Sequence, residues 1–284
     1  MGLEKIGFIG LGTMGIPMCK SLQAAGYPLT VFNRNKAKAE VLIENGAVLA
    51  QHPAELITAT DVVILMVTDD QAVDNLFNGE NGLLSAGVSG KVIINMSTVS
   101  PEISKKMAAL CSEQGNHYLD APVSGSVKQA NEATLIILVG SDDAVFVQVK
   151  PILEKIGKLA ILFGGIGAGN KAKLIINTFL AIQAQSLAEA MVFAENLNLE
   201  KGAIVEVLNN SALGSPFVKI KSDAILNDNY APAFTLNNIV KDLKLAKDIG
   251  LSTPLGLKSL ETFENATASL GAEDIISIFK RLKE

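Results

Sequence analysis

Three glycines near the amino end are the first residues whose spacing suggests chemistry. Gly10, Gly12 and Gly15 form a G-x-G-x-x-G pattern between an apolar, strand-like run and a helical pattern. In that context Gly10 permits a tight turn, Gly12 lets the backbone approach a pyrophosphate, and Gly15 lets the helix pack on the strand. The helix N-terminus adds amide N–H groups and a positive dipole end. The pattern predicts a dinucleotide site, and a glycine-rich turn without a ligand is the alternative.

The end of the next apolar run bears on which dinucleotide binds. Asn33 stands 21 residues after Gly12, where a domain selective for NAD carries Asp or Glu. A carboxylate there would repel a 2′-phosphate, whereas Asn33, Arg34 and the nearby Lys36 can bind that dianion through charge-assisted hydrogen bonds. We therefore expect NADP(H) to be preferred over NAD(H). The alternative is that Arg34 simply faces solvent, as many arginines do.

A Gly/Ser turn in the middle of the chain could bind an anionic substrate. In the segment DAPVSGS, residues 120–126, a strand end runs into Ser124, Gly125 and Ser126. These residues can present backbone N–H groups and hydroxyls to a carboxylate. An ordinary Pro/Gly turn explains the same residues equally well. The segment by itself leaves both interpretations open.

A lysine and an asparagine share one face of a long predicted helix. Lys173 and Asn177 are four residues apart, and the helix begins where two domains are expected to meet. A lysine beside a desolvated cleft can protonate a developing alkoxide, and Asn177 can orient it or hold the substrate. Lys171 is a competing candidate on another side of the helix. Either lysine could also be a solvated surface charge.

The elements that must position these residues form two different patterns. From Lys5 to about Leu162, short apolar runs alternate with helical segments such as 36–45 and 101–114. The expected strands are Ile6–Ile9, Leu29–Phe32, Val62–Val67, Val92–Asn95, Tyr118–Asp120, Leu135–Val139 and Leu159–Phe163. Continuous apolar strands with helical crossovers predict an α/β fold of the Rossmann type, a doubly wound and largely parallel sheet covered on both faces.

After the glycine-rich residues 163–169 the strand pattern stops and helices follow one another. The expected helices are 170–196, 201–210, 215–226, 235–249, 254–268 and 274–282, separated by Gly, Asn, Pro and Ser. We therefore predict a dinucleotide-binding domain over residues 1–164 and an all-helical domain for substrate binding and oligomerisation over residues 165–284. The long helix at 170–196 is expected to join them.

Composition limits the classes of function. The chain has 284 residues, 49% hydrophobic residues, a formal charge of −5, no Trp and three Tyr, so nucleic acid is not an expected partner. The apolar stretch Leu174–Leu197 contains Asn, Gln and Glu, which predicts a buried helix of a soluble protein and not a membrane span. With no evident signal peptide and two cysteines in apolar patterns, the expected location is cytoplasmic. His52 and His117 stand in no ligand-spaced cluster, so no metal is expected.

Four segments in order along nearly the whole chain resemble the β-hydroxyacid dehydrogenase family, of which 3-hydroxyisobutyrate dehydrogenase is a member. GFIGLGTMGIPM, residues 7–18, resembles the family's cofactor fingerprint, and DAPVSGS resembles its DAPVSGG, departing at Ser126. GIGAGNKAK resembles the approach to the catalytic lysine, and VKDLKLAKD, residues 240–248, resembles the KDLxLA helix. The resemblance is nearest to the glyoxylate/succinic semialdehyde reductase branch.

The resemblance implies roles residue by residue. It aligns the catalytic lysine on Lys173 and the family asparagine on Asn177, and it leaves Lys171 without a role. It places the substrate against Ser124, Gly125, Ser126, Phe234 and Asp242. The cofactor is expected against Gly10, Leu11, Gly12, Thr13, Met14, Gly15, Asn33, Arg34, Val67, Thr68, Thr98 and Lys241. Of these, Asn33 and Arg34 are expected from their fit to a 2′-phosphate and not from the resemblance.

The reaction implied is the NADP(H)-dependent reduction of a small semialdehyde or 2-oxo acid, such as glyoxylate or succinic semialdehyde, to the hydroxy acid. The hydride would come from nicotinamide C4 and the proton from Lys173. The partner would be a small carbonyl substrate bearing a carboxylate, and the family likeness implies a homo-dimer or homo-tetramer. An imine reductase and a catalytically silent NADP(H)-binding module are the alternatives. Lys173 favours carbonyl chemistry over the first, and retention of Lys173 with Asn177 argues against the second.

Overall fold

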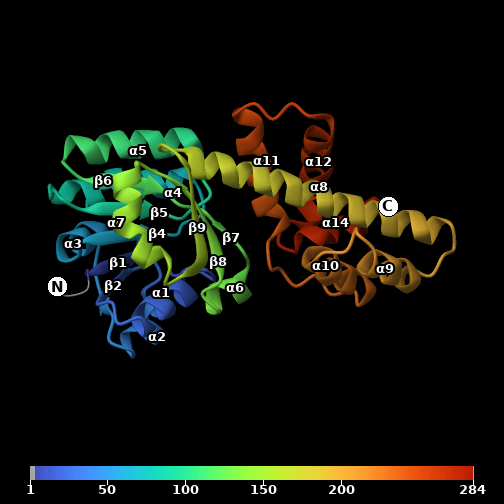
Figure 1. Ribbon diagram of the computed structural model, residues 1–284, viewed down its shortest axis with the longest axis horizontal. Coiled ribbons are helices and arrows are strands. Elements are labelled where there is room, and N and C mark those ends of the chain that lie inside the picture. The colour runs from blue at the N-terminus through green and yellow to red at the C-terminus, as the bar shows by residue number, and fades with distance from the viewer. Residues whose placement is uncertain (1–3, 284) are drawn as a thin grey trace. The chain divides into compact units, whose positions relative to one another are not determined.

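The computed structural model describes residues 4–283, and the chain divides into two compact units, residues 1–173 and 174–284. The first unit contains the whole sheet, and the second is helical. The expected fold class is thereby confirmed: a parallel α/β sheet of the Rossmann type precedes a helical part, and one long helix links them (Figure 1). The domain boundary expected after residue 164 stays a prediction, because the two compact units divide nine residues further on, inside that helix.

The sheet of the first unit has the strand order β3-β2-β1-β4-β5-β6-β8-β7, with β9 beside β8. The strands are β1 (Ile6–Ile9), β2 (Leu29–Phe32), β3 (Val48–Leu49), β4 (Val62–Leu65), β5 (Val92–Asn95), β6 (His117–Asp120), β7 (Val123–Ser124), β8 (Leu135–Gly140) and β9 (Gly157–Gly164). All pairs are parallel except β6 with β8 and β7 with β8. The chain order reverses direction at β1 and β4, which is where an open α/β sheet forms a binding crevice.

Strand ends differ in places from those expected from the sequence. The strand expected over Val62–Val67 ends at Leu65, because the Val67 N–H donates to the Ser97 hydroxyl at 2.9 Å and leaves the strand ladder. The two-residue strands β3 and β7 were not expected, since two residues are too few to establish an alternating pattern.

Both faces of the sheet are buried, because successive side chains of the inner strands enter different cores. In β4, Val62 and Ile64 join one apolar cluster, whereas Val63 and Leu65 join the other. Helices α1, α2 and α7 contribute to the first cluster, and α3, α4 and α5 contribute to the second. A strand covered on both sides needs apolar residues at every position, which explains the unbroken apolar runs in the sequence.

The helical segments of the first unit connect the strands. They are α1 (Gly15–Ala24), η1 (Lys36–Ala39), α2 (Glu40–Ile43), α3 (Pro53–Ala59), α4 (Asp70–Asn78), η2 (Leu83–Ala86), α5 (Pro101–Glu113), α6 (Val127–Asn131) and α7 (Asp143–Leu153), where η denotes a 3-10 helix. Several begin with a side-chain cap. Asp69 accepts from the Ala72 N–H at 2.8 Å at the start of α4, and Ser100 accepts from the Ile103 N–H at 3.0 Å at the start of α5.

Helix α8 (Ala168–Asn196) begins in the first unit and continues into the second (Figure 1). The remaining elements are α9 (Lys201–Asn210), α10 (Pro216–Leu226), α11 (Leu236–Asp248), α12 (Pro254–Glu264), α13 (Thr267–Leu270), η3 (Ile275–Ser277) and α14 (Ile278–Leu282). Ala181, Ala184 and Met191 of α8 pack into the apolar core of the helical unit with Ile239 and Leu243 of α11.

Of the described residues, α8 alone is long and apolar enough to span a membrane by length and composition. Its side chains instead form part of a folded core, and its buried Asn177 donates a hydrogen bond to an aspartate of α11. Only 39% of its most apolar stretch is buried, so the expectation of a buried helix holds along one side of α8. The other side leaves large apolar residues exposed.

Candidate functional site

The three glycines of the first turn have different structural requirements. Gly10 has φ +101°, and a Cβ there would lie 2.1 Å from the Met66 carbonyl oxygen; a Cβ on Gly15 would lie 2.0 Å from the Gly10 oxygen. Packing therefore excludes side chains at both positions. A Cβ on Gly12 would have no atom of the described chain within 4 Å. Because packing does not require a glycine at Gly12, its bare backbone leaves open space beside the N-terminus of α1, which fits a cradle for a dinucleotide pyrophosphate.

The start of α1 is suited to an anion. Met14 occupies the N-cap position and offers no side-chain hydrogen bond, and the first turn contains no acidic residue. Helix N-termini have backbone N–H groups without intrahelical partners, and a negative group stabilises them. The loop and helix together can therefore hold a phosphate without a competing carboxylate. Leu11 is buried in this turn, whereas Thr13 is exposed and Met14 half-buried.

Asn33 lies beside the glycine turn and braces it. Its Oδ1 accepts from the Leu11 N–H at 3.0 Å, and its Nδ2 donates to the Asn35 carbonyl at 2.9 Å. The Asn33 amide thus connects the end of β2 to the turn after β1. Arg34 is exposed, and the Lys36 ammonium donates to Gln51 Oε1 at 2.5 Å. Both cations are exposed, but Arg34 directly follows Asn33, and Lys36 already has the Gln51 amide oxygen as a partner.

The turns after β4 and β5 lie at the same edge of the sheet, because parallel strands end at one side. Val67 and Thr98 are half-buried there and Thr68 is exposed. Ser97 connects the two turns, since its hydroxyl accepts from the Val67 N–H and its own N–H donates to Asn95 Oδ1 at 3.0 Å. Val67, Thr68 and Thr98 therefore lie in turns at the carboxyl ends of the adjacent strands β4 and β5.

The three residues of the expected carboxylate-binding turn have different surroundings in the structure. Ser124 is half-buried in β7, and Gly125 has φ +136°, a left-handed conformation that favours glycine. The Ser126 hydroxyl and N–H both donate to Gln129 Oε1, at 2.7 and 2.8 Å. Ser126 is thus engaged in starting α6. Ser124 and Gly125 are the better placed pair for a substrate carboxylate.

A buried carboxylate caps the start of α8. Asp120, at the end of β6, is fully buried and accepts from the Gly167 N–H at 2.6 Å and the Asn170 N–H at 2.7 Å. Burial raises the pKa of the Asp120 carboxyl, and the hydrogen bonds from Gly167 and Asn170 oppose that rise. A negative group at a helix N-terminus is stabilised by the helix dipole. Sequence reasoning missed this role, because the capping residue and the helix are 47 residues apart.

Asn170 is a second residue that sequence reasoning did not single out. Its side chain is fully buried, its Oδ1 accepts from the Val99 N–H at 3.0 Å, and its Nδ2 donates to Ser104 Oγ at 3.2 Å. In the sequence, the only signal for Asn170 is a polar residue within a run of glycines and apolar residues. A buried amide must be hydrogen-bonded, but the sequence does not say to what.

The two α8 residues expected to act in catalysis differ in their surroundings. Lys173 is half-buried and Lys171 is exposed, a difference that favours Lys173 over its competitor. Asn177, one helical turn after Lys173, is 2% exposed and its Nδ2 donates to Asp242 Oδ2 at 2.5 Å. Lys241 Nζ lies 2.8 Å from Asp242 Oδ1 and forms an ion pair with it, although the geometry is not that of a hydrogen bond. Within the helical unit, Asn177, Lys241 and Asp242 therefore form one charged cluster.

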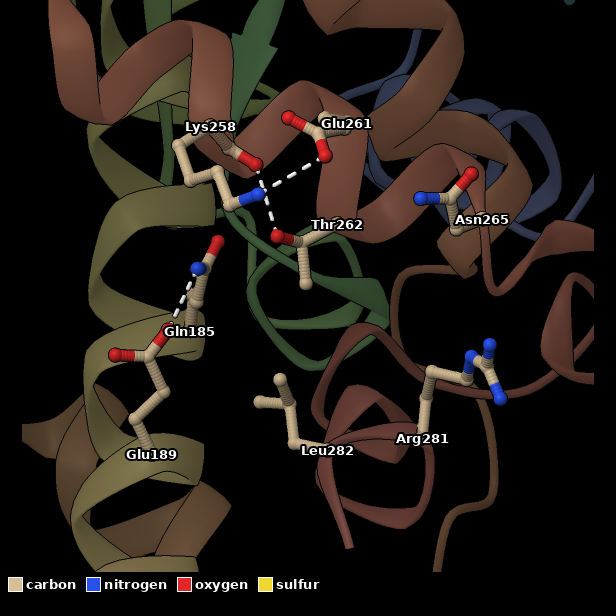
Figure 2. Close-up of a pocket in the computed structure, with 8 residues that line it drawn as sticks. All are labelled: Gln185, Glu189, Lys258, Glu261, Thr262, Asn265, Arg281 and Leu282. Carbon is tan, nitrogen blue, oxygen red and sulfur yellow. Dashed lines mark hydrogen bonds and ion pairs between the residues drawn. The ribbon is translucent and has the colours of Figure 1, made fainter. Parts of the chain in front are cut away.

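A surface hollow of the helical unit has other residues in its lining (Figure 2). It measures about 410 Å³ and is lined by Gln185, Glu189, Lys258, Glu261, Thr262, Asn265, Arg281 and Leu282. Lys258 pairs with Glu261 at 2.9 Å across its wall, and none of the residues expected to bind substrate or cofactor lines it. The hollow is therefore not part of the site predicted from the sequence.

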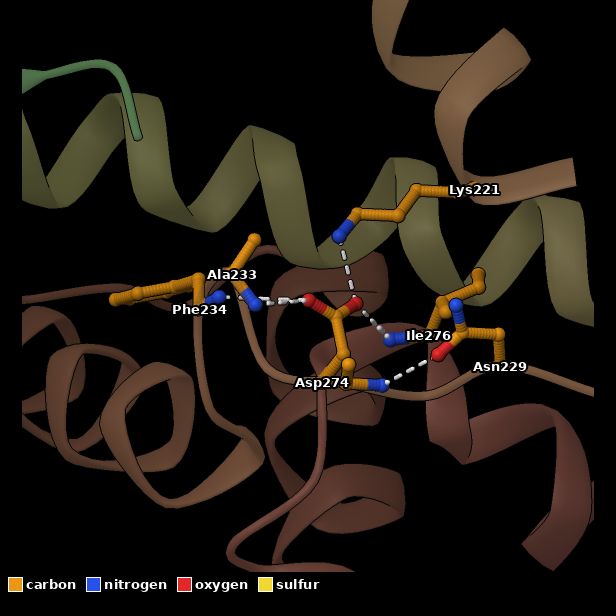
Figure 3. A network of polar contacts seen from close by, with 7 residues as sticks. Lys221, Asn229, Ala233, Phe234, Asp274 and Ile276 are labelled. Carbon is orange, nitrogen blue, oxygen red and sulfur yellow. Dashed lines mark hydrogen bonds and ion pairs between the residues drawn. The ribbon is translucent and has the colours of Figure 1, made fainter. Parts of the chain in front are cut away.

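The loop that presents Phe234 is held by a buried ion pair (Figure 3). Asp274 Oδ1 accepts from Lys221 Nζ at 2.6 Å and from the Ile276 N–H at 3.1 Å, and Asp274 Oδ2 accepts from the Ala233 and Phe234 N–H groups at 3.1 and 3.4 Å. Removing one partner of a buried ion pair typically costs about 3–5 kcal/mol, because the other charge is left uncompensated. The half-buried Phe234 is thus on a rigidly held loop.

Among residues 4–283, no group of three or more His, Cys, Asp and Glu side chains is placed to hold a metal ion. The two cysteines of the described chain, Cys19 and Cys111, are buried free thiols, and burial raises the pKa of both. A raised thiol pKa disfavours the reactive thiolate. Neither feature adds a catalytic group to the site.

Two family models and several known proteins match this chain over most of its length. Residues 5–167 match the NAD binding domain of 6-phosphogluconate dehydrogenase, and residues 167–282 match a family described as NAD-binding of NADP-dependent 3-hydroxyisobutyrate dehydrogenase. The 2-(hydroxymethyl)glutarate dehydrogenase of Eubacterium barkeri is 36% identical over 97% of this chain and 94% of its own length. Glyoxylate/succinic semialdehyde reductase 1 of Arabidopsis thaliana is 33% identical over 98% of each chain.

A solved structure extends the likeness to three dimensions. The structure of Mycobacterium tuberculosis 3-hydroxyisobutyrate dehydrogenase with L-serine superposes with a TM-score of 0.90 at 30% identity, and the match covers 100% of both chains. A match of this extent includes the sheet unit, helix α8 and the helical unit.

A substitution in the glycine turn can test cofactor affinity separately from the stability of the fold. Gly12→Ala is expected to unfold at the same denaturant concentration as the native chain, since its Cβ meets open space. It should bind NADPH at least about tenfold more weakly, because the methyl group occupies the path of the pyrophosphate. Titration of NADPH fluorescence measures the affinity, and urea unfolding measures the stability.

The matched control is Gly15→Ala, whose Cβ would lie 2.0 Å from a backbone oxygen. We expect this variant to unfold at a lower urea concentration than the native chain, with or without NADPH. Native NADPH affinity in Gly12→Ala would rule out the glycine turn as the cofactor cradle.

Proposed function

We propose that this chain, which belongs to the 3-hydroxyisobutyrate dehydrogenase-like family of β-hydroxyacid dehydrogenases, uses NADPH to reduce a small semialdehyde or 2-oxo acid to its hydroxy acid. The chain is an oxidoreductase with a nicotinamide-cofactor domain. Helix α8 is the observation that carries the proposal. It begins at the turn capped by Asp120, bears the half-buried Lys173 and, one turn later, bears Asn177 held by Asp242.

Glyoxylate or succinic semialdehyde is the substrate that we propose first. The 33% identity to a glyoxylate/succinic semialdehyde reductase supports this choice, as does a turn that offers the Ser124 hydroxyl and the Gly125 backbone to a carboxylate. Candidate acids differ by small groups worth only about 1–3 kcal/mol each in an apolar pocket. Steady-state oxidation of NADPH with a panel of semialdehydes and 2-oxo acids ranks them directly.

The protein's share of the reaction is positioning and proton transfer. When bound, the nicotinamide ring supplies the hydride. Ser124 and Gly125 orient the substrate through its carboxylate, and Asn177 steadies the carbonyl oxygen. Lys173 then transfers a proton from its ammonium group to the alkoxide oxygen, which completes the hydroxy acid. Because Asp242 fixes the Asn177 amide through a 2.5 Å hydrogen bond, Asn177 loses little freedom when the substrate binds.

Lys173→Ala is expected to lower kcat by about 10² to 10⁴, the usual contribution of general acid catalysis. The affinity for NADPH should stay within about twofold, because the glycine turn is untouched. Stopped-flow turnover and NADPH titration measure the two effects. Lys171→Ala is the matched control, since it removes an exposed lysine from the same helix and should keep native turnover. Full activity of Lys173→Ala would show that Lys173 is not the proton donor.

Arg34→Ala is expected to weaken NADPH binding by about tenfold or more while NADH binding barely changes. A hydrogen bond to a charged group contributes about 1.5–3 kcal/mol, and only NADPH has the 2′-phosphate that Arg34 would meet. Lys20→Ala removes another exposed cation, in α1, and controls for the loss of charge. Equal weakening of both cofactors would argue that Arg34 does not select NADP(H).

We further propose that the chain forms a homo-dimer or homo-tetramer through α8, in the cytoplasm. Ile175, Phe179 and Phe193 on that helix are 69%, 60% and 64% exposed. Large apolar side chains at helical spacing favour burial against a partner. Light scattering should give at least twice the chain mass, and Phe193→Glu should lower it. Ser186→Glu adds the same charge at an exposed polar position of α8 and serves as control. A native mass in Phe193→Glu would exclude this side of α8.

A further inference from the structure

One buried side chain connects three segments that sequence reasoning assigned to different parts of the site. Asn170 lies in the first turn of α8, three residues before Lys173. Its Oδ1 accepts from the Val99 N–H at 3.0 Å, and Val99 follows Thr98 in the loop after β5. Its backbone N–H donates to Asp120 Oδ2 at 2.7 Å, and Asp120 begins the segment that leads to Ser124.

The contacts of Asn170 continue into a polar network buried inside the first unit. Asn170 Nδ2 donates to Ser104 Oγ of α5 at 3.2 Å, and that oxygen also accepts from the Tyr118 hydroxyl at 3.4 Å. Asn95 Nδ2 donates to the Tyr118 oxygen at 3.0 Å. Asn170, Ser104, Asn95 and Tyr118 are all buried. Water cannot readily replace a lost partner at such depth, so this arrangement of the backbone is strongly preferred.

The geometry fixes how α8 begins relative to the sheet. The Gly167 and Asn170 N–H groups are bound by Asp120 of β6, and the Asn170 side chain reaches the loop after β5. Glycine at 169 permits this approach, since a Cβ there would lie 2.2 Å from the Leu138 carbonyl oxygen. The first turn of α8 therefore cannot slide or tilt without breaking bonds to two strand ends.

We propose that Asn170 is a positioning residue: it sets the place of the Lys173 ammonium group relative to the Thr98 loop and the Ser124 turn. This inference rests on the proposed function of Lys173. Asn170 itself touches neither substrate nor cofactor in this proposal. It acts through the first turn of α8, because a shift of about 1 Å in a catalytic group can cost a hundredfold in rate.

The test is Asn170→Ala in the full-length chain, with two independent measurements. Hydrogen exchange should become faster at the Val99 amide, whose acceptor is removed, and at the amides of residues 167–173, because the first turn of α8 loses its side-chain bonds to Val99 and Ser104 while the backbone bonds to Asp120 remain. This readout needs neither substrate nor cofactor. Turnover should fall at least about tenfold while KM for NADPH stays within about threefold, since misplacement affects the reacting groups and leaves the glycine turn intact.

Tyr118→Phe is the matched control. It removes a buried hydroxyl from the same network, with its bonds to Asn95 and Ser104, but no bond to α8. We expect a similar loss of thermal stability, native exchange at residues 167–173 and native kcat. An equal loss of kcat in Tyr118→Phe and Asn170→Ala would overturn the proposal, because any damage to the core would then explain the loss.

The outcomes separate this inference from the proposed function. If Lys173→Ala is inactive but Asn170→Ala turns over at the native rate, or if exchange at residues 167–173 is unchanged, Asn170 does not position Lys173. Native turnover of Lys173→Ala would refute the proposed function instead. Should Asn170→Ala fail to fold, Ser104→Ala removes the oxygen that Asn170 Nδ2 meets. It should lower kcat about threefold with KM for NADPH kept, and no fall would count against the proposal.

Discussion

The capping of α8 by the Asp120 carboxylate is the interaction on which the candidate site depends. A buried carboxylate is costly unless hydrogen-bond donors surround it, and here two backbone N–H groups at 2.6 and 2.7 Å do so. The same bonds satisfy N–H groups at a helix start, which would otherwise lack partners. The Asp120 carboxylate and the N–H groups at the helix start thus satisfy each other's hydrogen-bonding needs. The same bonds join the end of β6 to the helix that bears Lys173.

Parallel strand ends bring the predicted cofactor-binding residues of the first unit to one edge of the sheet. The turns after β1, β2, β4 and β5 all leave the sheet at its carboxyl side, so residues far apart in the sequence become neighbours there. Side chains then fix those turns to one another: Asn33 holds the glycine turn, and Ser97 holds the turn after β4. These hydrogen bonds restrain the two turns, and a restrained turn loses less entropy when it binds a ligand.

The helical unit applies the same rule to its own polar residues. Asp242 is buried between the Asn177 amide and the Lys241 ammonium, and Asp274 is buried among Lys221 and three backbone N–H groups. Each carboxylate fixes a segment that the family likeness implicates in substrate binding. These carboxylates also explain two polar residues within otherwise apolar helices, Asn177 of α8 and Lys221 of α10.

The sequence by itself determined the fold class, the glycine turn and the family, because these are expressed in local patterns: apolar runs of strand length, a glycine spacing, and four motifs in order. It also predicted Asn177 and Asp242 as site residues, without indicating that they bind one another. Only the tertiary structure decided that Asp120 caps α8, that Asn170 bridges two strand ends, and that Ser126 is occupied by Gln129. The physical reason is that each of the first two depends on partners at least 47 residues away. A buried polar group must have a hydrogen-bond partner, but only the folded chain determines which group that partner is.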